Sequence, residues 1–182
     1  MMLSETAKAL IPKARIFGFT AEISNSVLHT ADDEGRYLTD SELDTLVAMQ
    51  PNTPVSAVRF LRDHALEIAA ESHAQLIAEQ PELTQPGGGL YPPLRAEACL
   101  RDLWHFLRCT TYGIASQNPE FTSPEGLHYM QLLYQELQVP LPAMVRGLEG
   151  NKTASLKRLS LIDQETFAPY FEHLIEKFKA FH

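Results

Sequence analysis

The chain has few cysteines, no long apolar run and no surplus of basic residues, and each shortage excludes a class of protein. Its 182 residues include two cysteines, too few for the disulfide framework of a small secreted domain. No apolar stretch approaches the roughly 18 residues of a membrane-spanning helix. Acidic residues outnumber basic ones by 23 to 15, which gives a net charge of -8. Binding to nucleic acid is not expected, because it depends on clustered Lys and Arg at the phosphates.

Metal-binding and targeting motifs are also missing. Neither a CxxC nor an HExxH spacing occurs, so no metal site is expected. The first residues lack the basic start and apolar stretch of a signal peptide, which predicts a cytoplasmic protein. Cys99 and Cys109 lie about 15 Å apart along one predicted helix, whereas a disulfide needs Cα atoms within about 7 Å. The two thiols therefore cannot pair with each other.

Helical periodicity is what the sequence does contain. Apolar residues recur at spacings of three and four, and no segment alternates with the period of two that marks a half-buried strand. The apolar fraction of 45% and the charged fraction of 21% are those of a globular domain with one core. These patterns predict an all-α fold of about seven or eight helices, packed as a globin-like domain or a bundle.

Start signals place the first helices of this core. Thr39 and Glu42 form a capping box, in which each side chain satisfies a backbone N–H of the other residue. Thr53 is expected to cap one long helix that has Pro54 as its first residue and ends before Pro81.

Proline also marks the later helix starts. Ser123 and Pro124 repeat the pattern of a cap followed by proline. The last helix is expected to have Thr166 as its cap, because Pro169 then falls in the first turn, where N–H groups have no partner to lose. The aromatic residues that follow are expected to be core.

Residues 4–29 are expected to form two short helices with a break near Pro12, because an interior proline removes a hydrogen bond and clashes with the preceding turn. The segment is rich in apolar residues for a chain end. It is therefore expected to dock either on its own domain or on a partner subunit, with neither favoured. These apolar residues are Ile16, Phe17, Phe19, Ile23 and Val27.

The stretch Pro86–Arg108 passes from a Gly- and Pro-rich loop into a helix with an unusual face. Arg95, Cys99, Asp102 and Phe106 follow each other at four, three and four residues, so they share one face. Nearby cations and the helix N-terminus favour a lowered thiol pKa at Cys99, and Asp102 opposes it. A thiol, a cation, a carboxylate and an aromatic ring on one stripe indicate a ligand-binding site.

Three chemistries could explain this stripe, and a plain buried thiol with a surface Arg–Asp pair is the alternative to all three. Hydrolysis with a cysteine nucleophile is disfavoured, because His105 lies about 120° round the helix from Cys99. Haem binding through His64, His73 or His105 is an alternative for a globin-like fold. Ligand attachment fits better, with a thiol to hold the ligand, basic groups for its acidic arms and a carboxylate for its N–H groups.

The segment ACLRDLWHFLRCTTYGI resembles the bilin-attachment helix of the phycobiliproteins, with its Cys-x-Arg-Asp pattern, aromatic run and Thr-Tyr. The resemblance extends from roughly His29 to the C-terminus and is nearest to the allophycocyanin subunits. Further stretches agree in order and spacing. They are ADDEGRYLTDSELD, PGGGLY, LLYQELQVPLPAMVRGLEGNK and APYFEHLIEKF.

The resemblance implies a globin-like domain over residues 31–182, preceded by a helical extension over residues 1–30. It also implies a thioether-linked open-chain tetrapyrrole, phycocyanobilin or another bilin. Cys99 would be the attachment thiol, and Asp102 would accept hydrogen bonds from the pyrrole N–H groups. The remaining expected contacts are Arg101 and Arg95 with propionates, and Phe106, Tyr134 and His105 around the rings.

Three features depart from the family pattern. Leu103–Leu107 reads LWHFL where Leu-Asp-Tyr-Tyr-Leu is common, which can change the spectrum or the protonation of a chromophore. Gly89 replaces an asparagine that is methylated in β subunits, so that modification is excluded. About twenty extra residues precede the usual start, in the region that the family uses to pair α with β subunits, which argues against conventional ring assembly. Cys109 is expected to be a small core residue.

The family function implied is light absorption and transfer of excitation energy in or beside the phycobilisome, without enzymatic turnover. Another phycobiliprotein subunit or a second copy is the expected partner, and attachment can require a bilin lyase. The expected location is the cytoplasm, including the cytoplasmic face of the thylakoid membrane. The alternative is a specialised relative outside the antenna: a bilin carrier, a regulator of antenna assembly or degradation, or a light sensor.

Overall fold

The computed structural model describes residues 3–19 and 26–182 and has the predicted all-α architecture. Within these ranges it contains nine α-helices, one 3₁₀ helix and no β-strand. None of these helices is long and apolar enough to cross a bilayer. Their bounds are α1 (Glu5–Leu10), α2 (Ser26–Asp33), α3 (Asp40–Met49), α4 (Val55–Asp63), α5 (Ala65–Glu79), η1 (Pro81–Thr84), α6 (Pro93–Ala115), α7 (Pro124–Glu136), α8 (Leu141–Leu156) and α9 (Leu161–Lys179).

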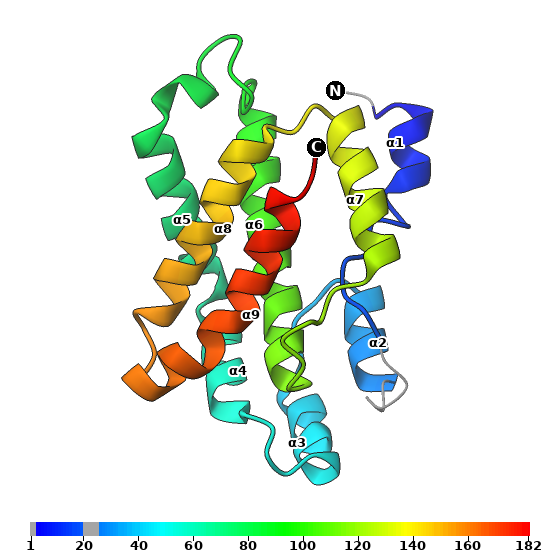
Figure 1. The fold of residues 1–182 in the computed structure, drawn as a ribbon, viewed down its shortest axis with the longest axis vertical. Helices are drawn as coiled ribbons and strands as arrows, with labels where there is room; N and C mark the ends of the chain where they lie inside the picture. Colours follow the sequence, from blue (N-terminus) through cyan, green and yellow to red (C-terminus); the bar gives the residue numbers. More distant parts are fainter. Residues whose placement is uncertain (1–2, 20–25) are drawn as a thin grey trace.

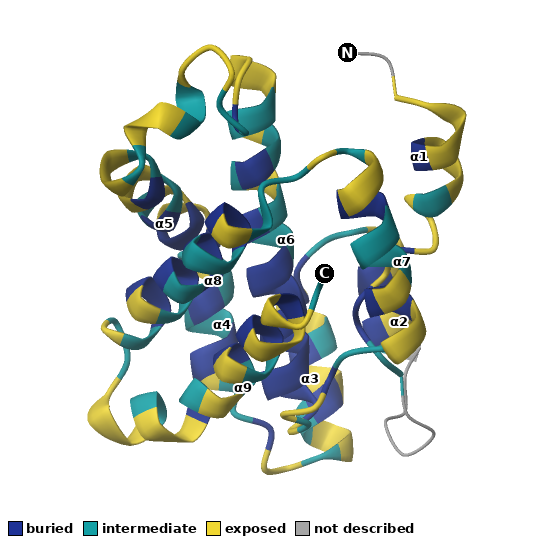
Figure 2. Ribbon diagram, turned by 45° about the horizontal axis from the view of Figure 1, so that its top comes forward, coloured by how far each residue is buried: buried dark blue, intermediate teal, exposed yellow. Residues whose placement is uncertain are grey.

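Helix α6 runs through the middle of the molecule (Figure 1). α5 and α8 pack against each other on one side of it, and α9 packs beside α8 and over α6. α7 lies on the other side, with α1 packed on its outer surface. The second half of α6 is buried at every residue from Phe106 to Ala115 (Figure 2). Packing on all sides therefore fixes the position of the helix that carries Cys99.

Two of the expected helix starts are confirmed. The Thr39 side chain accepts from the backbone N–H of Glu42 while the Glu42 carboxylate accepts from that of Thr39, so the capping box is complete. The Ser123 side chain caps α7 by accepting from the Gly126 N–H at 3.1 Å, and Pro124 is the first helical residue.

The single helix expected after Thr53 is wrong in two respects. Pro54 occupies the N-cap position, and the buried Thr53 hydroxyl has no hydrogen-bond partner. The segment also divides into α4 and α5 at His64, whose φ of -104° and ψ of 8° leave helical geometry. The His64 ring stacks on Phe60 with centroids 4.2 Å apart, and its Nδ1 lies 2.9 Å from the Phe60 carbonyl oxygen. These local contacts stabilise the break. The break divides one expected helix into α4 and α5, so the structure has one helix more than the periodicity suggests.

The expected start of the last helix is also wrong. α9 begins at Leu161, because the Ser160 side chain accepts from the Asp163 N–H at 3.2 Å. Thr166 lies inside the helix and donates to the Ile162 carbonyl at 2.8 Å, and Pro169 is interior. An interior proline is tolerated because Phe167 and Phe171 are buried on either side of it. The expectation that the aromatic stripe is core is confirmed at Phe171 and Phe178, and Tyr170 and Phe181 are partly buried.

Residues 3–19 form a segment that we call the N-terminal strap. Its helix α1 ends at Leu10 and a turn contains Pro12, so the expected break there is confirmed. Residues 14–19 are not the expected second helix. Their backbone is extended, because the Ile16 carbonyl accepts from the Ser123 N–H and the Gly18 N–H donates to the Phe121 carbonyl, each at 2.7 Å.

The strap docks on its own domain. Ile16 and Phe17 are each 3% exposed and belong to the main core cluster. Phe19 and Val27 pack against the same cluster, whereas Ile23 falls outside the described residues. The boundary expected between residues 30 and 31 falls inside α2.

Glu42 provides a test of the capping box. Two N–H groups of Arg36 at 2.7 and 2.8 Å and the Thr39 amide hold the pKa of Glu42 at about 2, below its ordinary value of 4.5. Glu42→Gln should lower the free energy of unfolding by about 1 to 2 kcal/mol at pH 7. A depressed carboxyl pKa stabilises the fold fully above 4.5 and loses its effect as the pH falls from 4.5 through 2. Urea unfolding at pH 7, 4 and 2 measures the difference. The exposed Glu97→Gln variant is the control, and an undiminished Glu42→Gln effect at pH 2 would contradict the assignment.

Candidate functional site

The first half of α6 carries the stripe that the sequence singles out, and it faces α7 and α9. Cys99 is 4% exposed. Asp102 contacts Tyr134 of α7, and Phe106 contacts Phe178 of α9 with ring centroids 4.8 Å apart. Arg95 also reaches the end of α7. The prediction that these residues share one face is confirmed.

Asp102 is a carboxylate with few hydrogen-bond donors. The Tyr134 hydroxyl donates to Asp102 Oδ2 at 3.1 Å, and Arg101 Nη2 lies 3.4 Å from Oδ1. Burial raises the pKa of Asp102 above its ordinary value, and the Arg101 charge and these two hydrogen bonds oppose that rise without cancelling it. The Tyr134 pKa is also raised, first by burial and then by the Asp102 charge. Asp102 is thus a partly buried acceptor that further N–H donors would stabilise.

The neighbouring cations do not activate the Cys99 thiol. Burial, followed by the negative charge of Asp102, raises its pKa to about 12. Neither arginine compensates. The Arg101 side chain is 65% exposed, and Arg95 is engaged elsewhere. The thiol is therefore protonated and unreactive in this arrangement.

Arg95 holds three backbone segments together. Its Nε donates to the Gly89 carbonyl at 2.7 Å, its Nη1 to the Leu137 carbonyl at 3.1 Å and its Nη2 to the Gln138 carbonyl at 2.6 Å. The guanidinium thus fastens the Gly-rich loop and the end of α7 to the start of α6. Periodicity places Arg95 on the stripe, but carbonyl partners supplied by distant segments are not readable from spacing.

Aromatic rings close the stripe on the side of α9. The Phe178 ring lies 5.9 Å from Tyr134 and 4.7 Å from Phe181, centroid to centroid. The C-terminal His182 carbonyl accepts from Gln131 and Gln135 of α7 at 2.8 and 2.6 Å. The last residues therefore bridge from α9 to α7, as the C-terminal segment in Figure 1 shows.

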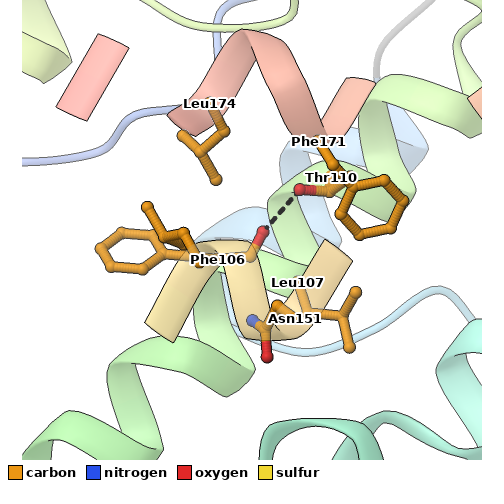
Figure 3. A pocket seen from close by; sticks show the side chains of 7 residues that line it. Phe106, Leu107, Thr110, Asn151, Phe171 and Leu174 are labelled. Atoms are coloured by element: carbon orange, nitrogen blue, oxygen red, sulfur yellow. Dashed lines mark hydrogen bonds between the residues drawn. The ribbon is translucent and has the colours of Figure 1, made fainter. Parts of the chain in front are cut away.

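A cavity of about 10 Å³ lies deeper, between α6, α8 and α9. Figure 3 shows Phe106 and Thr110 of α6 facing Phe171 and Leu174 of α9, with Asn151 of α8 beside them. The cavity has room for about one water molecule. Cys99 does not line this cavity.

His105 lies on another side of α6. A Cβ added at Gly35, in the loop after α2, would lie 3.7 Å from His105 Cε1. Burial, followed by the charges of Arg108 and Arg101, lowers the pKa of His105 to about 4. The neighbouring Trp104 carbonyl accepts from the Tyr37 hydroxyl at 3.0 Å. His105 is therefore an uncharged residue at the contact between α6 and the loop after α2. Its side chain points about 120° round the helix axis from that of Cys99.

The structure also shows a buried polar cluster that the sequence reasoning missed. Arg108 Nη1 donates to Asp32 Oδ1 at 2.9 Å and to the Tyr112 hydroxyl at 2.8 Å. The Tyr112 hydroxyl in turn donates to the Arg36 carbonyl. One feature of the sequence points to this cluster: Arg108 lies in the middle of an apolar helical run. An arginine that is buried there needs a polar partner, because arginine is rarely buried without one.

Comparison with known proteins identifies the family of this chain. The profile of the family described as phycobilisome protein matches residues 26–178. The chain belongs to the phycobilisome protein family. Among its relatives, allophycocyanin subunit alpha-B of Synechocystis sp. is 34% identical over 157 residues, covering 85% of this chain and 97% of the relative. The allophycocyanin alpha-B chain of Cyanophora paradoxa is 32% identical over 156 residues, covering 85% and 96%. The allophycocyanin beta chain of Aglaothamnion neglectum is 31% identical over 151 residues, covering 82% and 93%.

Membership of the phycobilisome protein family confirms the resemblance and the globin-like all-α fold. Phycobiliproteins of the allophycocyanin type carry covalently bound linear tetrapyrroles and assemble with other subunits in phycobilisomes. The residues of the stripe fit such a group. Asp102 is a partly buried carboxylate short of donors, with its side chain 26% exposed, and the buried Cys99 thiol lies one helical turn away on the same face.

Thiol chemistry tests the electrostatics of the ligand-free site. At pH 8 a maleimide should modify Cys99 roughly 100-fold more slowly in the folded chain than in urea, because the thiol is buried and its pKa is raised. Asp102→Asn should accelerate the folded-state reaction several-fold, because it removes the negative charge that helps to raise the pKa. Mass spectrometry of peptides separates Cys99 from Cys109. Equal rates in the folded and unfolded chains would contradict the assignment.

Proposed function

We propose that this chain carries a linear tetrapyrrole on Cys99 and serves as a light-absorbing protein in or beside the phycobilisome. The observation that carries the proposal is the presence on one helix face of a buried thiol and of Asp102, a partly buried carboxylate short of hydrogen-bond donors. When bound, phycocyanobilin or another bilin would supply visible absorption and transfer of excitation energy. Like its relatives, the chain would catalyse no reaction.

Asp102 is the proposed orienting group. It would accept hydrogen bonds from pyrrole N–H groups, and these would relieve the burial cost that now raises its pKa. Tyr134 holds the carboxylate in place from α7 through its 3.1 Å hydrogen bond. The acceptor would therefore be preorganised on two packed helices.

Arg101 is the proposed partner of a propionate. Its guanidinium is 65% exposed and makes one hydrogen bond at 3.4 Å, so it can form charge-assisted bonds with a carboxylate at low cost. Arg95 is the second expected partner. It would reach a propionate only by exchanging its carbonyl bonds to Gly89, Leu137 or Gln138.

Aromatic side chains would restrict the motion of the bound group. Phe106 and Tyr134 are buried and linked through Phe178, so they present rigid apolar walls that exclude water. His105 would contribute no positive charge near neutral pH, because its pKa is about 4. Together they favour an extended, stiff chromophore whose excitation is not lost through rotation.

A bilin lyase is a proposed partner in attachment. Thioether formation needs a nucleophilic sulfur, yet the Cys99 pKa is about 12 and the side chain is 4% exposed. An external protein that opens the aromatic cover and supplies a base would remove both obstacles. The other proposed partners are a phycobiliprotein subunit or a second copy of the chain, in the cytoplasm or at the cytoplasmic face of the thylakoid membrane.

A specialised relative outside the antenna is the second candidate function. The strap favours it, because residues 3–19 lie before the matched range and cover a large part of α7. In this case the same pocket would serve a bilin carrier, an assembly or degradation regulator, or a light sensor.

Pigment attachment is the direct test of the proposal. The chain produced with phycocyanobilin and a lyase should show a visible band and a bilin mass adduct that survives denaturation. Cys99→Ala should lose both, whereas Cys109→Ala, a matched variant at the other buried thiol, should keep both. No adduct on the unmodified chain, or an adduct retained in Cys99→Ala, would contradict the proposal.

Arg101→Ala separates a pigment contact from a structural role. The free energy of unfolding of the pigment-free chain should change by no more than about 0.5 kcal/mol, because the side chain is largely exposed. The adduct yield or the visible band of the pigmented chain should change, and Arg101→Lys should restore part of the loss. Arg95→Ala should instead lower the free energy of unfolding by about 1 to 3 kcal/mol, because it leaves carbonyls without donors. Unchanged yield and spectrum in Arg101→Ala would contradict its role.

A further inference from the structure

The outer surface of α7 is covered by α1, the helix of the N-terminal strap (Figure 1). The Ser4 hydroxyl donates to the Glu136 carboxylate at 2.6 Å. Ala7 and Ala14 pack in one buried cluster with Leu133. Among the helices that the structure describes, α1 packs more closely on α7 than any other does. It is therefore the neighbour that restricts the movement of α7 most directly.

The stretch of α7 that α1 covers also forms a wall of the proposed pigment site. Tyr134 follows Leu133 directly, and its hydroxyl donates to Asp102 Oδ2 at 3.1 Å. The Leu137 side chain packs against the strap cluster, whereas its carbonyl accepts from Arg95 Nη1 at 3.1 Å. Different sides of one stretch of α7 thus contact the strap and the stripe on α6.

The bonds from this stretch to α6 depend on long side chains. The Arg95 guanidinium reaches the Leu137 and Gln138 carbonyls, and the Tyr134 hydroxyl lies at the tip of its side chain. Hydrogen bonds weaken when the heavy atoms are more than about 3.2 Å apart, and the Tyr134–Asp102 bond is already 3.1 Å long. A small movement of α7 away from α6 therefore breaks this bond, unless a closely packed neighbour prevents the movement.

Cys99 lies beside the same tyrosine. Burial raises the pKa of the Tyr134 hydroxyl, and interactions with Asp102 and then with Cys99 raise it further, so the three groups lie together. The Tyr134 residue is 5% exposed and Cys99 is 4% exposed. Water therefore has little access to either side chain while α7 stays in place, and a displaced Tyr134 would open a route to the thiol.

We propose that α1 is a positioning element of the pigment site, which holds α7 against α6 so that Tyr134 stays bonded to Asp102 and Cys99 stays buried. Ala7 and Leu133 act through Tyr134 and are positioning residues. The strap precedes the part of the chain that the family profile matches, so this support lies outside the shared family domain. Its effect on the pigment rests on the proposed function, whereas its effect on the Cys99 thiol does not.

Ala7→Glu removes the support selectively. Ala7 is 0% exposed, so a glutamate there places a charge and extra volume between α1 and Leu133 of α7. Glutamate is a good helix former, so the change does not oppose α1 itself. Leu10→Glu, also at the contact with α7, is the second variant. Ala9→Glu makes the same change on the exposed side of α1 and is the matched control.

The rate of maleimide modification of Cys99 in the pigment-free chain reports on the support. Ala7→Glu and Leu10→Glu should raise this rate roughly fivefold or more, because a displaced Tyr134 opens the thiol to solvent. Ala9→Glu should leave the rate unchanged. Cys109 is the internal control, because it lies in the half of α6 that is buried at every residue. Mass spectrometry of peptides gives the two rates separately.

Three results of this measurement would overturn the proposal. The first is a Cys99 rate in both Ala7→Glu and Leu10→Glu equal to that of the unaltered chain. The second is an equal acceleration in Ala9→Glu. The third is an acceleration of Cys109 by the same factor as Cys99, which would show that the whole fold opens and not the wall at α7 alone.

The pigmented chain provides a readout that a merely structural role would not change. With α7 displaced, Asp102 would hold the bilin less rigidly, so Ala7→Glu should lower the fluorescence yield per bound pigment roughly twofold while the mass adduct remains. Ala7→Ser, which keeps a small side chain at the contact, should retain the full yield. An unchanged yield in Ala7→Glu overturns the role of α1 at the pigment. Absence of any adduct on the unaltered chain contradicts the proposed function instead, and the Cys99 rates then decide whether α1 positions α7.

Discussion

The buried carboxylate of Asp32 is the interaction on which the arrangement of the molecule depends. Its side chain is 4% exposed and accepts from Arg108 of α6 at 2.9 Å and from Arg15 of the strap at 2.5 and 3.0 Å. A buried charge that loses its partner costs about 3 to 5 kcal/mol. Asp32 therefore requires both α6 and the strap to stay where they are, and α6 is the helix that carries the site.

The same burial gives the site its chemistry. Burial of Cys99 and partial burial of Asp102 raise the pKa of both groups, so the thiol stays protonated and the carboxylate is held at a cost. An exposed pair would be easier to modify but would not favour a ligand with N–H donors so strongly, because water would already satisfy the carboxylate. The stripe is thus well suited to retaining a bound group and poorly suited to acquiring one unaided.

Sequence reasoning predicted only part of what local chemistry determines, and it failed where distant segments decide. Periodicity and the Thr39–Glu42 box depend on neighbours within one turn, and both predictions are confirmed. The extended path of residues 14–19 depends on backbone groups of residues 121–123, about a hundred positions away. Arg95 is similar: its place on the stripe follows from spacing, but its three carbonyl partners come from a loop and from α7. The cap at Ser160 is a local signal of this kind, since Asp163 follows it at capping distance, whereas Pro169 suggests a later start.

Helix α7 contacts both the N-terminal strap and the stripe around Cys99, two regions that the sequence gives no reason to connect. Its Leu133 packs in a small cluster with Ala7 and Ala14 of the strap, while the next residue, Tyr134, holds Asp102. Successive residues of a helix point about 100° apart, so one side of α7 contacts the strap and another forms a wall of the site. A displacement of α7 by even one ångström toward the strap would lengthen the 3.1 Å bond that orients the carboxylate. Because close-packed elements move as units, the cover on α7 and the geometry around Cys99 are physically coupled.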